Sequence, residues 1–343
     1  MIRAGLFAAA VFVFAFAMPG CASSRDARPS GADRAAVAAI DPTALPITTG
    51  DAFPPEPVPY GVMLRRLASA DAVLFGELHG HPAGLALARR LTEDLIAARP
   101  GSFALALEFV ERDEQHHLDD YLTGVTDLEG FTAALGRTSP PDHTALIDAA
   151  RDAGRPVIAA NAPRRYVRLA RTAGLDRLAG LNAAQRALFR APAALTEGGY
   201  RERFYEVMGA MFEQSSPHAR AATGGDGGGE EAGSDAAPAH GGAHTHGALH
   251  ADDPIRPFFV AQNVWDATMA ESVARARGAG LSPVLLIVGQ FHTDHAGGLV
   301  ERLRALRPTD DIVTVSLLTE PPTDDDADRA DFLVEVGPPP AHN

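Results

Sequence analysis

The chain has 343 residues, 46% of them hydrophobic, which is enough for one large domain or two small ones with a sizeable core. Its 44 acidic residues outnumber its 30 basic ones, for a net charge of −14, and this balance argues against a nucleic-acid partner, because phosphate binding needs a basic face. All 30 basic residues are arginine, so Schiff-base and phosphate-loop lysine chemistry are excluded.

The first 21 residues predict a lipoprotein signal peptide. Arg3 gives a positive start, and Ala4–Met18 is an apolar run shorter than the ~20 residues that a spanning helix needs, so a cleaved signal is expected rather than an anchor. Gly20 before Cys21 resembles a bacterial lipobox, in which the cysteine receives acyl chains such as palmitate, although Met18 stands where leucine is usual. Ordinary secretion is the alternative. Because Cys21 is the only cysteine, no internal disulfide is expected.

Residues 22–58 are rich in Ala, Asp, Pro and Ser and show no period, which predicts a flexible tether to the membrane surface. From residue 60 to 337, apolar runs alternate with helical patterns. The expected strands are Val73–Phe75, Phe103–Phe109, Pro156–Ala160, Pro283–Val288, Asp311–Leu318 and, at an edge, Phe332–Val336. The expected helices are Leu85–Ala98, Glu114–Tyr121, Ala145–Ala153, Tyr166–Ala173, Phe259–Arg277 and Leu299–Leu306. This alternation predicts an α/β fold with a mainly parallel sheet flanked by helices.

Two stretches interrupt the alternation. Residues 176–213 contain no strand pattern and predict a smaller, inserted helical subdomain. Its apolar face, with Phe204, Met208 and Met211, is either a core stripe or a soft wall around a flat ligand. Residues 215–254 are Gly- and His-rich and predict a disordered insertion. Its histidines are either solvated or weak metal ligands: His218, His240, His244, His246 and His250.

Polar side chains follow four of the expected strands. Glu77 and His79 end the first, Glu108 the second, Asn161 and Arg164 the third, and His292 the fourth. Because the carboxyl ends of parallel strands meet at one edge, we expect these groups to converge. Glu77, His79, Glu108 and His292 could then hold a divalent metal or act as acid and base. Glu108 or Asp294 could orient a ligating histidine. Gln262 and Asp266 share a helix face and are either part of this site or a surface pair.

Five blocks carry a resemblance to a known family. They read GELHGH at 76–81, LALEFVERDEQ at 105–115, NAPRRYVR at 161–168, QNVWDATMA at 262–270 and VGQFHTDHAGGL at 288–299. In this order, over about residues 60–320, the chain resembles the ChaN-like haem-binding lipoproteins, whose superfamily includes the Tiki proteases and erythromycin-esterase-like proteins. The resemblance implies a parallel-sheet domain with a smaller helical domain, haem binding, iron acquisition, and two haems face to face in a homodimer as one arrangement.

The resemblance also implies site residues. The metal-like or catalytic positions of the superfamily match Glu77, His79, Glu108 and His292, and four further block members have no assigned role: Asn161, Arg164, Gln262 and Asp266. The axial haem ligand lies outside the blocks, and the candidates are Tyr200, Tyr205, His218 and the loop histidines. Arg164 or Arg165 could pair with haem propionates, beside a wall made by Met208 and Met211.

Three functions follow from these observations. We expect a haem-binding protein anchored by lipid in the bacterial envelope, with haem as its ligand and no nucleic-acid partner. The alternative is a metal-dependent or general-base hydrolase at the Glu/His edge. The third is an envelope protein whose loop histidines buffer metal ions.

Overall fold

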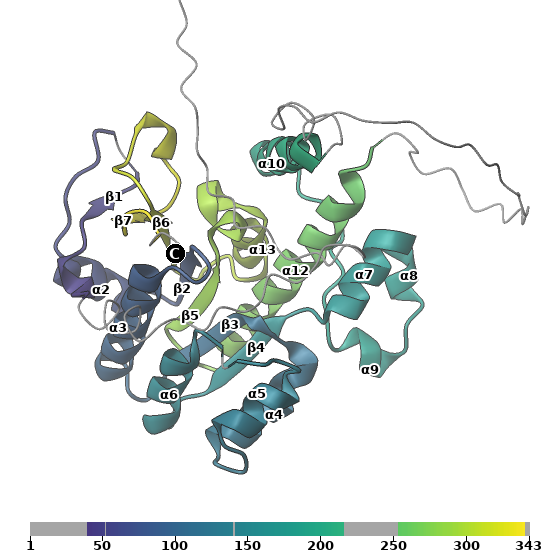
Figure 1. Ribbon diagram of the computed structural model, residues 1–343, viewed down its shortest axis with the longest axis horizontal. Coiled ribbons are helices and arrows are strands. Elements are labelled where there is room, and N and C mark those ends of the chain that lie inside the picture. The colour runs from purple at the N-terminus through teal and green to yellow at the C-terminus, as the bar shows by residue number, and fades with distance from the viewer. Residues whose placement is uncertain (1–39, 52, 140, 216–252, 340–343) are drawn as a thin grey trace, which may run out of the picture.

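A seven-stranded sheet organises the molecule (Figure 1). The computed structural model describes residues 40–51, 53–139, 141–215 and 253–339. The strands lie in the order β1-β7-β6-β2-β5-β3-β4. Their bounds are β1 Ile47–Thr49, β2 Ala72–Glu77, β3 Ala104–Glu111, β4 Val157–Asn161, β5 Val284–Gly289, β6 Ile312–Leu318 and β7 Phe332–Glu335. All neighbouring strands are parallel except β1 and β7, so the prediction of a mainly parallel sheet is confirmed.

Helices cover both faces of this sheet. They are α2 Tyr60–Ser69, α3 Pro82–Ala98, α4 Gln115–Leu122, α5 Leu128–Ala134, α6 Thr144–Asp152, α7 Arg164–Ala173, α8 Asp176–Ala179, α9 Ala183–Arg186, α10 Gly199–Ser215, α12 Arg256–Gly278 and α13 Gly298–Leu306. The six predicted helices are confirmed to within a few residues. Helices α2 and α5 were not predicted. Within the described part of the chain, no helix has both the length and the apolar composition to cross a bilayer.

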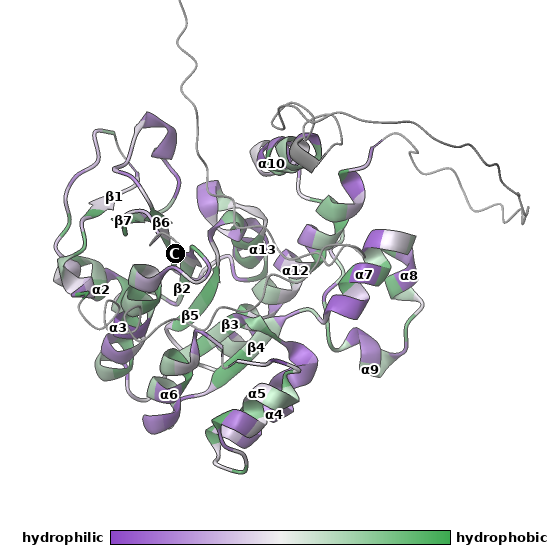
Figure 2. Ribbon diagram, viewed as in Figure 1, coloured by the Kyte–Doolittle hydropathy of each residue, from purple (hydrophilic) through white to green (hydrophobic). Residues whose placement is uncertain are grey.

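Successive residues of each strand enter two different cores, as the two-residue period of a strand requires. Val73 and Phe75 of β2 pack toward α2, α3 and α6, whereas Ala72 and Leu74 pack toward α7, α12 and α13. Figure 2 shows β5 apolar along most of its length, while the surrounding helices are apolar on one side and polar on the other. Strands buried on both faces explain why their sequences are continuously apolar.

The N-terminal part of the described chain corrects two predictions. Residues 22–58 do not form a tether throughout, because β1 pairs with β7 and Ile47 is buried. Phe332–Val336 is not an edge strand either, because β7 lies between β6 and β1. β1 has only three residues, which are too few to show a period. It is hydrogen-bonded to β7, almost 300 residues later in the sequence, so no local pattern predicts it.

Helix α12 is buried nearly all round. Every residue from Phe259 to Ala270 is buried, including the polar side chains of Gln262, Asn263 and Asp266. The alternative of a surface pair for Gln262 and Asp266 is therefore wrong. A helix buried on all sides must satisfy its polar groups internally. Those groups connect the sheet to the helical segment that follows β4.

Candidate functional site

A small cavity lies where β2, β3 and β4 end. Its volume is about 210 Å³. The lining residues are Glu77, His79, Glu108, Phe109, Glu111, Arg137, His143, Asn161, Arg164, Trp265 and Ile287. The structure thus brings Glu77, His79, Glu108, Asn161 and Arg164 to one pocket from three strands. His292 does not line this cavity but lies fully buried behind Glu108.

Glu77 is held between two imidazoles. His79 Nδ1 lies 2.8 Å from one carboxylate oxygen, and His143 Nε2 lies 2.7 Å from the other. Burial by itself would raise the pKa of Glu77, but the charge and hydrogen bonds of His143 and then His79 outweigh it and lower the pKa to about 2. Glu77 is therefore ionised at neutral pH, and it fixes the ring of His79, whose side chain is 40% exposed.

The other side of the His79 ring lies against the end of β5. A Cβ atom on Gly289 would come within 2.8 Å of His79 Nε2, so glycine leaves room for the His79 ring in this position, whereas the 3.6 Å to Glu108 Oε2 would be an ordinary contact. Burial disfavours the charged ring, yet the bond to Glu77 and the charges of Glu108 and Glu77 raise the pKa of His79. The exposed imidazole is thus oriented by one carboxylate and lies near a second, which is the arrangement of a proton-transferring group.

His143 was missed by sequence reasoning. It precedes α6, in the loop before that helix, and its ring stacks on Phe109 at 4.6 Å between centroids. No strand end or motif marks it, because its position depends on how α6 packs against the sheet. The only available signal was its histidine side chain beside a predicted helix start.

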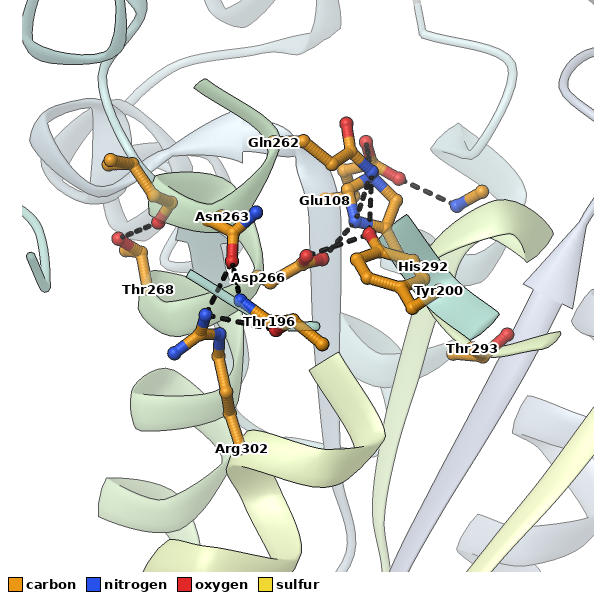
Figure 3. A network of polar contacts seen from close by, with 12 residues as sticks. Glu108, Thr196, Tyr200, Gln262, Asn263, Asp266, Thr268, His292, Thr293 and Arg302 are labelled. Atoms are coloured by element: carbon orange, nitrogen blue, oxygen red, sulfur yellow. Dashed lines mark hydrogen bonds and ion pairs between the residues drawn. The ribbon is translucent and has the colours of Figure 1, made fainter. Parts of the chain in front are cut away.

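A second histidine lies between two carboxylates deeper in the protein (Figure 3). His292 Nδ1 is 2.5 Å from Asp266 Oδ1, and His292 Nε2 is 3.5 Å from Glu108 Oε1. The other oxygen of Glu108 accepts the backbone N–H of Gly289 at 2.6 Å. Although burial opposes the charge, Asp266 and then Glu108 raise the pKa of His292 to about 10. His292 is therefore an imidazolium at neutral pH.

The same α12 side chains fasten the helical segment to the sheet domain. The Tyr200 hydroxyl of α10 donates to Asp266 at 2.7 Å, and the Gln262 amide donates to Tyr200 at 3.1 Å. Asn263 accepts the backbone N–H of Thr196 at 2.8 Å and the Arg302 guanidinium at 2.6 Å (Figure 3). A series of polar contacts through α12 thus links Glu108, at the pocket, to Tyr200 of α10.

A divalent metal is not supported by this geometry. Among the residues that the structure describes, no group of three or more His, Cys, Asp or Glu side chains is arranged to hold a metal ion. Both oxygens of Glu77 are occupied by imidazoles, and His292 lies in the ion pairs described above. Of the two carboxylates expected to orient a histidine, Glu108 lies 3.5 Å from His292 Nε2, opposite Asp266. Asp294 does not contact this ring, because it accepts from Ser316 at 2.7 Å and lies 3.4 Å from Arg329.

Two block members of unassigned role have structural partners. Asn161 Oδ1 accepts the N–H of Ala162 at 2.9 Å, at the end of β4. Arg164 is largely exposed, and both its backbone N–H and its guanidinium approach Glu111, at 3.1 and 3.3 Å. Arg165, the other candidate partner for propionates, pairs with Asp113.

The two candidate tyrosines lie in different environments. Tyr200 is only 4% exposed, and burial followed by the charge of Asp266 raises its pKa well above 10, so it does not fit a tyrosinate ligand. Tyr205 is half-buried on α10, and its hydroxyl donates to Asp253 at 2.7 Å. Met208 and Met211 are half-buried on the same helix. His218, the loop histidines and Cys21 lie outside the described residues.

The fold and the pocket together define an α/β protein with a charged cleft at the carboxyl edge of a parallel sheet and a docked helical segment. The sequence model described as "Haem-binding uptake, Tiki superfamily, ChaN" matches residues 63–303, and the chain belongs to this family. The family expected from the five sequence blocks is therefore confirmed. No curated protein matches the sequence.

One solved structure shows the same fold at low identity, and two further structures match with lower TM-scores. A structure described as cofacial heme binding to ChaN of Campylobacter jejuni is 15% identical, with a TM-score of 0.58, over 85% of this chain and 96% of that one. An erythromycin esterase, EreC, in an open conformation is 13% identical, with a TM-score of 0.39, over 80% and 78%. The type III effector HopBA1 is 13% identical, with a TM-score of 0.38, over 81% and 93%.

The charge on His292 gives a testable pH dependence. Because its folded-state pKa of about 10 lies above the ordinary 6.5, its contribution to stability is complete below about pH 6.5 and is lost as the pH rises through 10. Asp266→Asn should lower that pKa and cost about 3–5 kcal/mol, because one partner of a buried pair is neutralised. Imidazole NMR titration with parallel denaturation measures both, and Tyr200→Phe is the control that keeps the carboxylate. Titration of wild-type His292 near its ordinary pKa would contradict the assignment.

Proposed function

We propose that the chain binds haem, as a lipid-anchored protein of the bacterial envelope that serves haem and iron acquisition. Membership of the haem-binding uptake family carries this proposal. The structural similarity to ChaN supports a common fold. The lipobox at Cys21 supports the anchor and the envelope location.

Haem does not fit the small pocket. Pockets that enclose a drug-sized ligand have volumes of roughly 300–1,000 Å³, and haem is no smaller than such a ligand. The cavity beside His79 has only about 210 Å³, and its walls are mostly charged or polar. A porphyrin needs flat apolar walls, so we propose that haem binds at another part of the described chain.

The aromatic surface of α10 and the start of α12 has the right chemistry. Phe204 and Phe259 form its buried base at 5.1 Å between ring centroids, and Phe212 contacts Phe258 at 5.6 Å. Tyr205 and Met208 are half-buried at the margin of this cluster. Helix α10 lies at the side of the molecule, next to the first turns of α12 (Figure 1). These apolar side chains would pack on a porphyrin face, with Tyr205 as the axial iron ligand. Burial and the hydrogen bond to Asp253 raise the pKa of Tyr205 as well, so the iron would have to displace the Asp253 carboxylate to bind the phenolate oxygen.

A second copy presenting the same α10 surface would cover the other face of each haem. We therefore propose a homodimer with two haems between the copies as the arrangement to test. The surface is only half-buried in one copy, which is consistent with a ligand enclosed by two.

Hemin titration of the purified protein tests haem binding and its ligand together. We expect a shifted Soret band in the wild-type protein, and Tyr205→Phe should weaken hemin binding at least about tenfold, or about 1.4 kcal/mol, because the axial oxygen is lost. Tyr166→Phe, which changes a tyrosine of α7 outside the α10 surface, is the control and should retain hemin affinity. An unshifted Soret band at micromolar protein would exclude haem binding, and equal losses in both variants would exclude Tyr205 as the ligand.

The lipid anchor depends on the only cysteine. Cys21→Ser should release the mature protein from the membrane fraction, because a serine cannot accept the thioether-linked lipid. Fractionation of cells, with mass spectrometry of the N-terminus, measures the change. Equal membrane association of the variant would show that the anchor lies elsewhere or that the protein is held by another route.

A second candidate function is favoured by the geometry around His79. The Glu77 carboxylate fixes Nδ1, and the partly exposed ring lines the pocket, which is where a general base for hydrolysis would stand. No Ser, Thr or Cys lines the described cavity, so water would be the nucleophile. This activity uses a different part of the molecule from the α10 surface and is compatible with haem binding.

The acid–base function predicts a specific loss. His79→Gln should lower the rate of hydrolysis of an activated acyl ester such as p-nitrophenyl butanoate by about 10²–10⁴-fold, because the base is removed while the pocket remains. The control His117→Gln changes a histidine of α4 that does not line the cavity. A wild-type rate no greater than that of His79→Gln would exclude this function, while hemin binding stays a separate measurement.

A further inference from the structure

Arginines follow one side of helix α7. Arg164, Arg168 and Arg171 stand four and then three residues apart, so they lie on the same side of the helix. The opposite side is buried in the core, through Tyr166, Val167 and Ala170. Helix α7 contains no acidic residue, although the whole chain has a net charge of −14. The outer side of α7 is therefore locally basic on an acidic protein.

The two ends of this row of arginines lie at different surfaces. At the start of α7, Arg164 lines the small pocket and approaches Glu111. Near the end of α7, the Arg171 guanidinium lies 4.9 Å from the centroid of the Phe258 ring, and Phe258 in turn contacts Phe212 of α10. Helix α7 packs beside α12, which carries Phe258 (Figure 1). Arg171 therefore places a cation beside the aromatic surface that we propose for haem.

A guanidinium stacked on an aromatic ring can also bind a carboxylate. Stacking uses the flat faces of the guanidinium, whereas hydrogen bonds to a carboxylate are made at its edge. Haem carries two propionate carboxylates on an otherwise flat and apolar macrocycle, so it needs an aromatic wall with a cation at the margin. Phe258 and Arg171 provide both. Arg164 and Arg165, the partners predicted from the sequence, pair instead with carboxylates near the start of α7.

The opposite end of the aromatic surface suits a carboxylate less well. Tyr205 lies seven residues before Phe212 on α10, or about 10 Å along the helix. The Arg201 guanidinium lies 5.1 Å from the centroid of the Tyr205 ring, but the Asp253 carboxylate accepts from the Tyr205 hydroxyl. Because a propionate at this end would meet a like charge, a porphyrin on this surface would direct its carboxylates toward Phe212 and Arg171.

We propose that Arg171 binds a propionate of haem at the Phe258 end of the α10 surface, so that the site selects porphyrins with ionised carboxylates over their neutral esters. This inference rests on the haem-binding function proposed above, and it adds the class of porphyrin and its orientation. The arginines of α7 also supply positive charge beside the surface, on a protein whose net charge would otherwise repel an anionic porphyrin.

Hemin and hemin dimethyl ester separate the contribution of the carboxylates from that of the macrocycle. In Soret titrations of the purified full chain, hemin should bind at least about tenfold more tightly than the ester. Arg171→Gln should weaken hemin binding about ten- to hundredfold, as expected for a lost charge-assisted hydrogen bond, and should leave the affinity for the ester within about twofold. Arg171→Lys keeps the charge and should recover part of the hemin affinity.

Arg168→Gln is the matched control, because it removes the same charge from the same side of α7, one turn before Arg171. Arg168 is exposed, and its charge is screened by salt, so hemin affinity should stay within about threefold of the wild-type value. Thermal unfolding of each variant without porphyrin checks that the fold is kept.

The outcomes separate this proposal from haem binding itself. A loss confined to hemin in Arg171→Gln would support it. Equally tight hemin binding by the wild-type protein and Arg171→Gln would overturn the propionate contact and leave haem binding in place. Equal losses for hemin and the ester would show that Arg171 only supports the Phe258 ring, and an equal loss in Arg168→Gln would show general attraction by charge; either result overturns the proposal. No Soret shift with either porphyrin would exclude both the contact and haem binding.

Discussion

The buried ion pair between His292 and Asp266 is the interaction on which the arrangement of this protein depends. A charged imidazole with no exposed surface is costly unless opposite charges surround it. Asp266 supplies one such charge from α12, and Glu108 supplies the other from β3. His292 and its two carboxylate partners therefore hold α12, β3 and the segment after β5 in fixed positions relative to one another.

The need to satisfy these charges extends to the helical segment. The second oxygen of Asp266 accepts from Tyr200, so α10 completes the shell around the carboxylate. Gly298 leaves the space for this contact, because a Cβ there would lie 2.5 Å from Asp266 Oδ2 and 2.6 Å from a carbon of the Tyr200 ring. The placement of the aromatic surface on α10 is thus a consequence of buried electrostatics at the carboxyl edge of the sheet.

The sequence alone predicted those features of the fold and the pocket that depend on the hydrophobic period of each element and on the parallel arrangement of the strands. The apolar strands and the meeting of Glu77, His79 and Glu108 follow from parallel strands whose carboxyl ends share an edge. Sequence reasoning could not assign Tyr200 its structural role, because a tyrosine on an apolar helix face looks the same whether it faces solvent or a carboxylate. It also gave no weight to His143, whose position depends on tertiary packing of the loop before α6. Burial of α12 on every side likewise depends on neighbours from several parts of the chain.

The small pocket and the α10 surface differ in the kind of ligand that their side chains suit. Haem needs wide apolar contact and one iron ligand, and nothing in that requirement explains an imidazole oriented by Glu77, a glycine that makes room for it, or a second histidine behind Glu77. Each of these features instead controls the position and charge of a single exposed ring. Buried charges are costly unless they are paired, and the pairs around Glu77 include the partly exposed ring of His79. The arrangement fits the proposed acid–base role of His79 on a ligand much smaller than a porphyrin, and the proposed haem surface on α10 would be a separate site on the same fold.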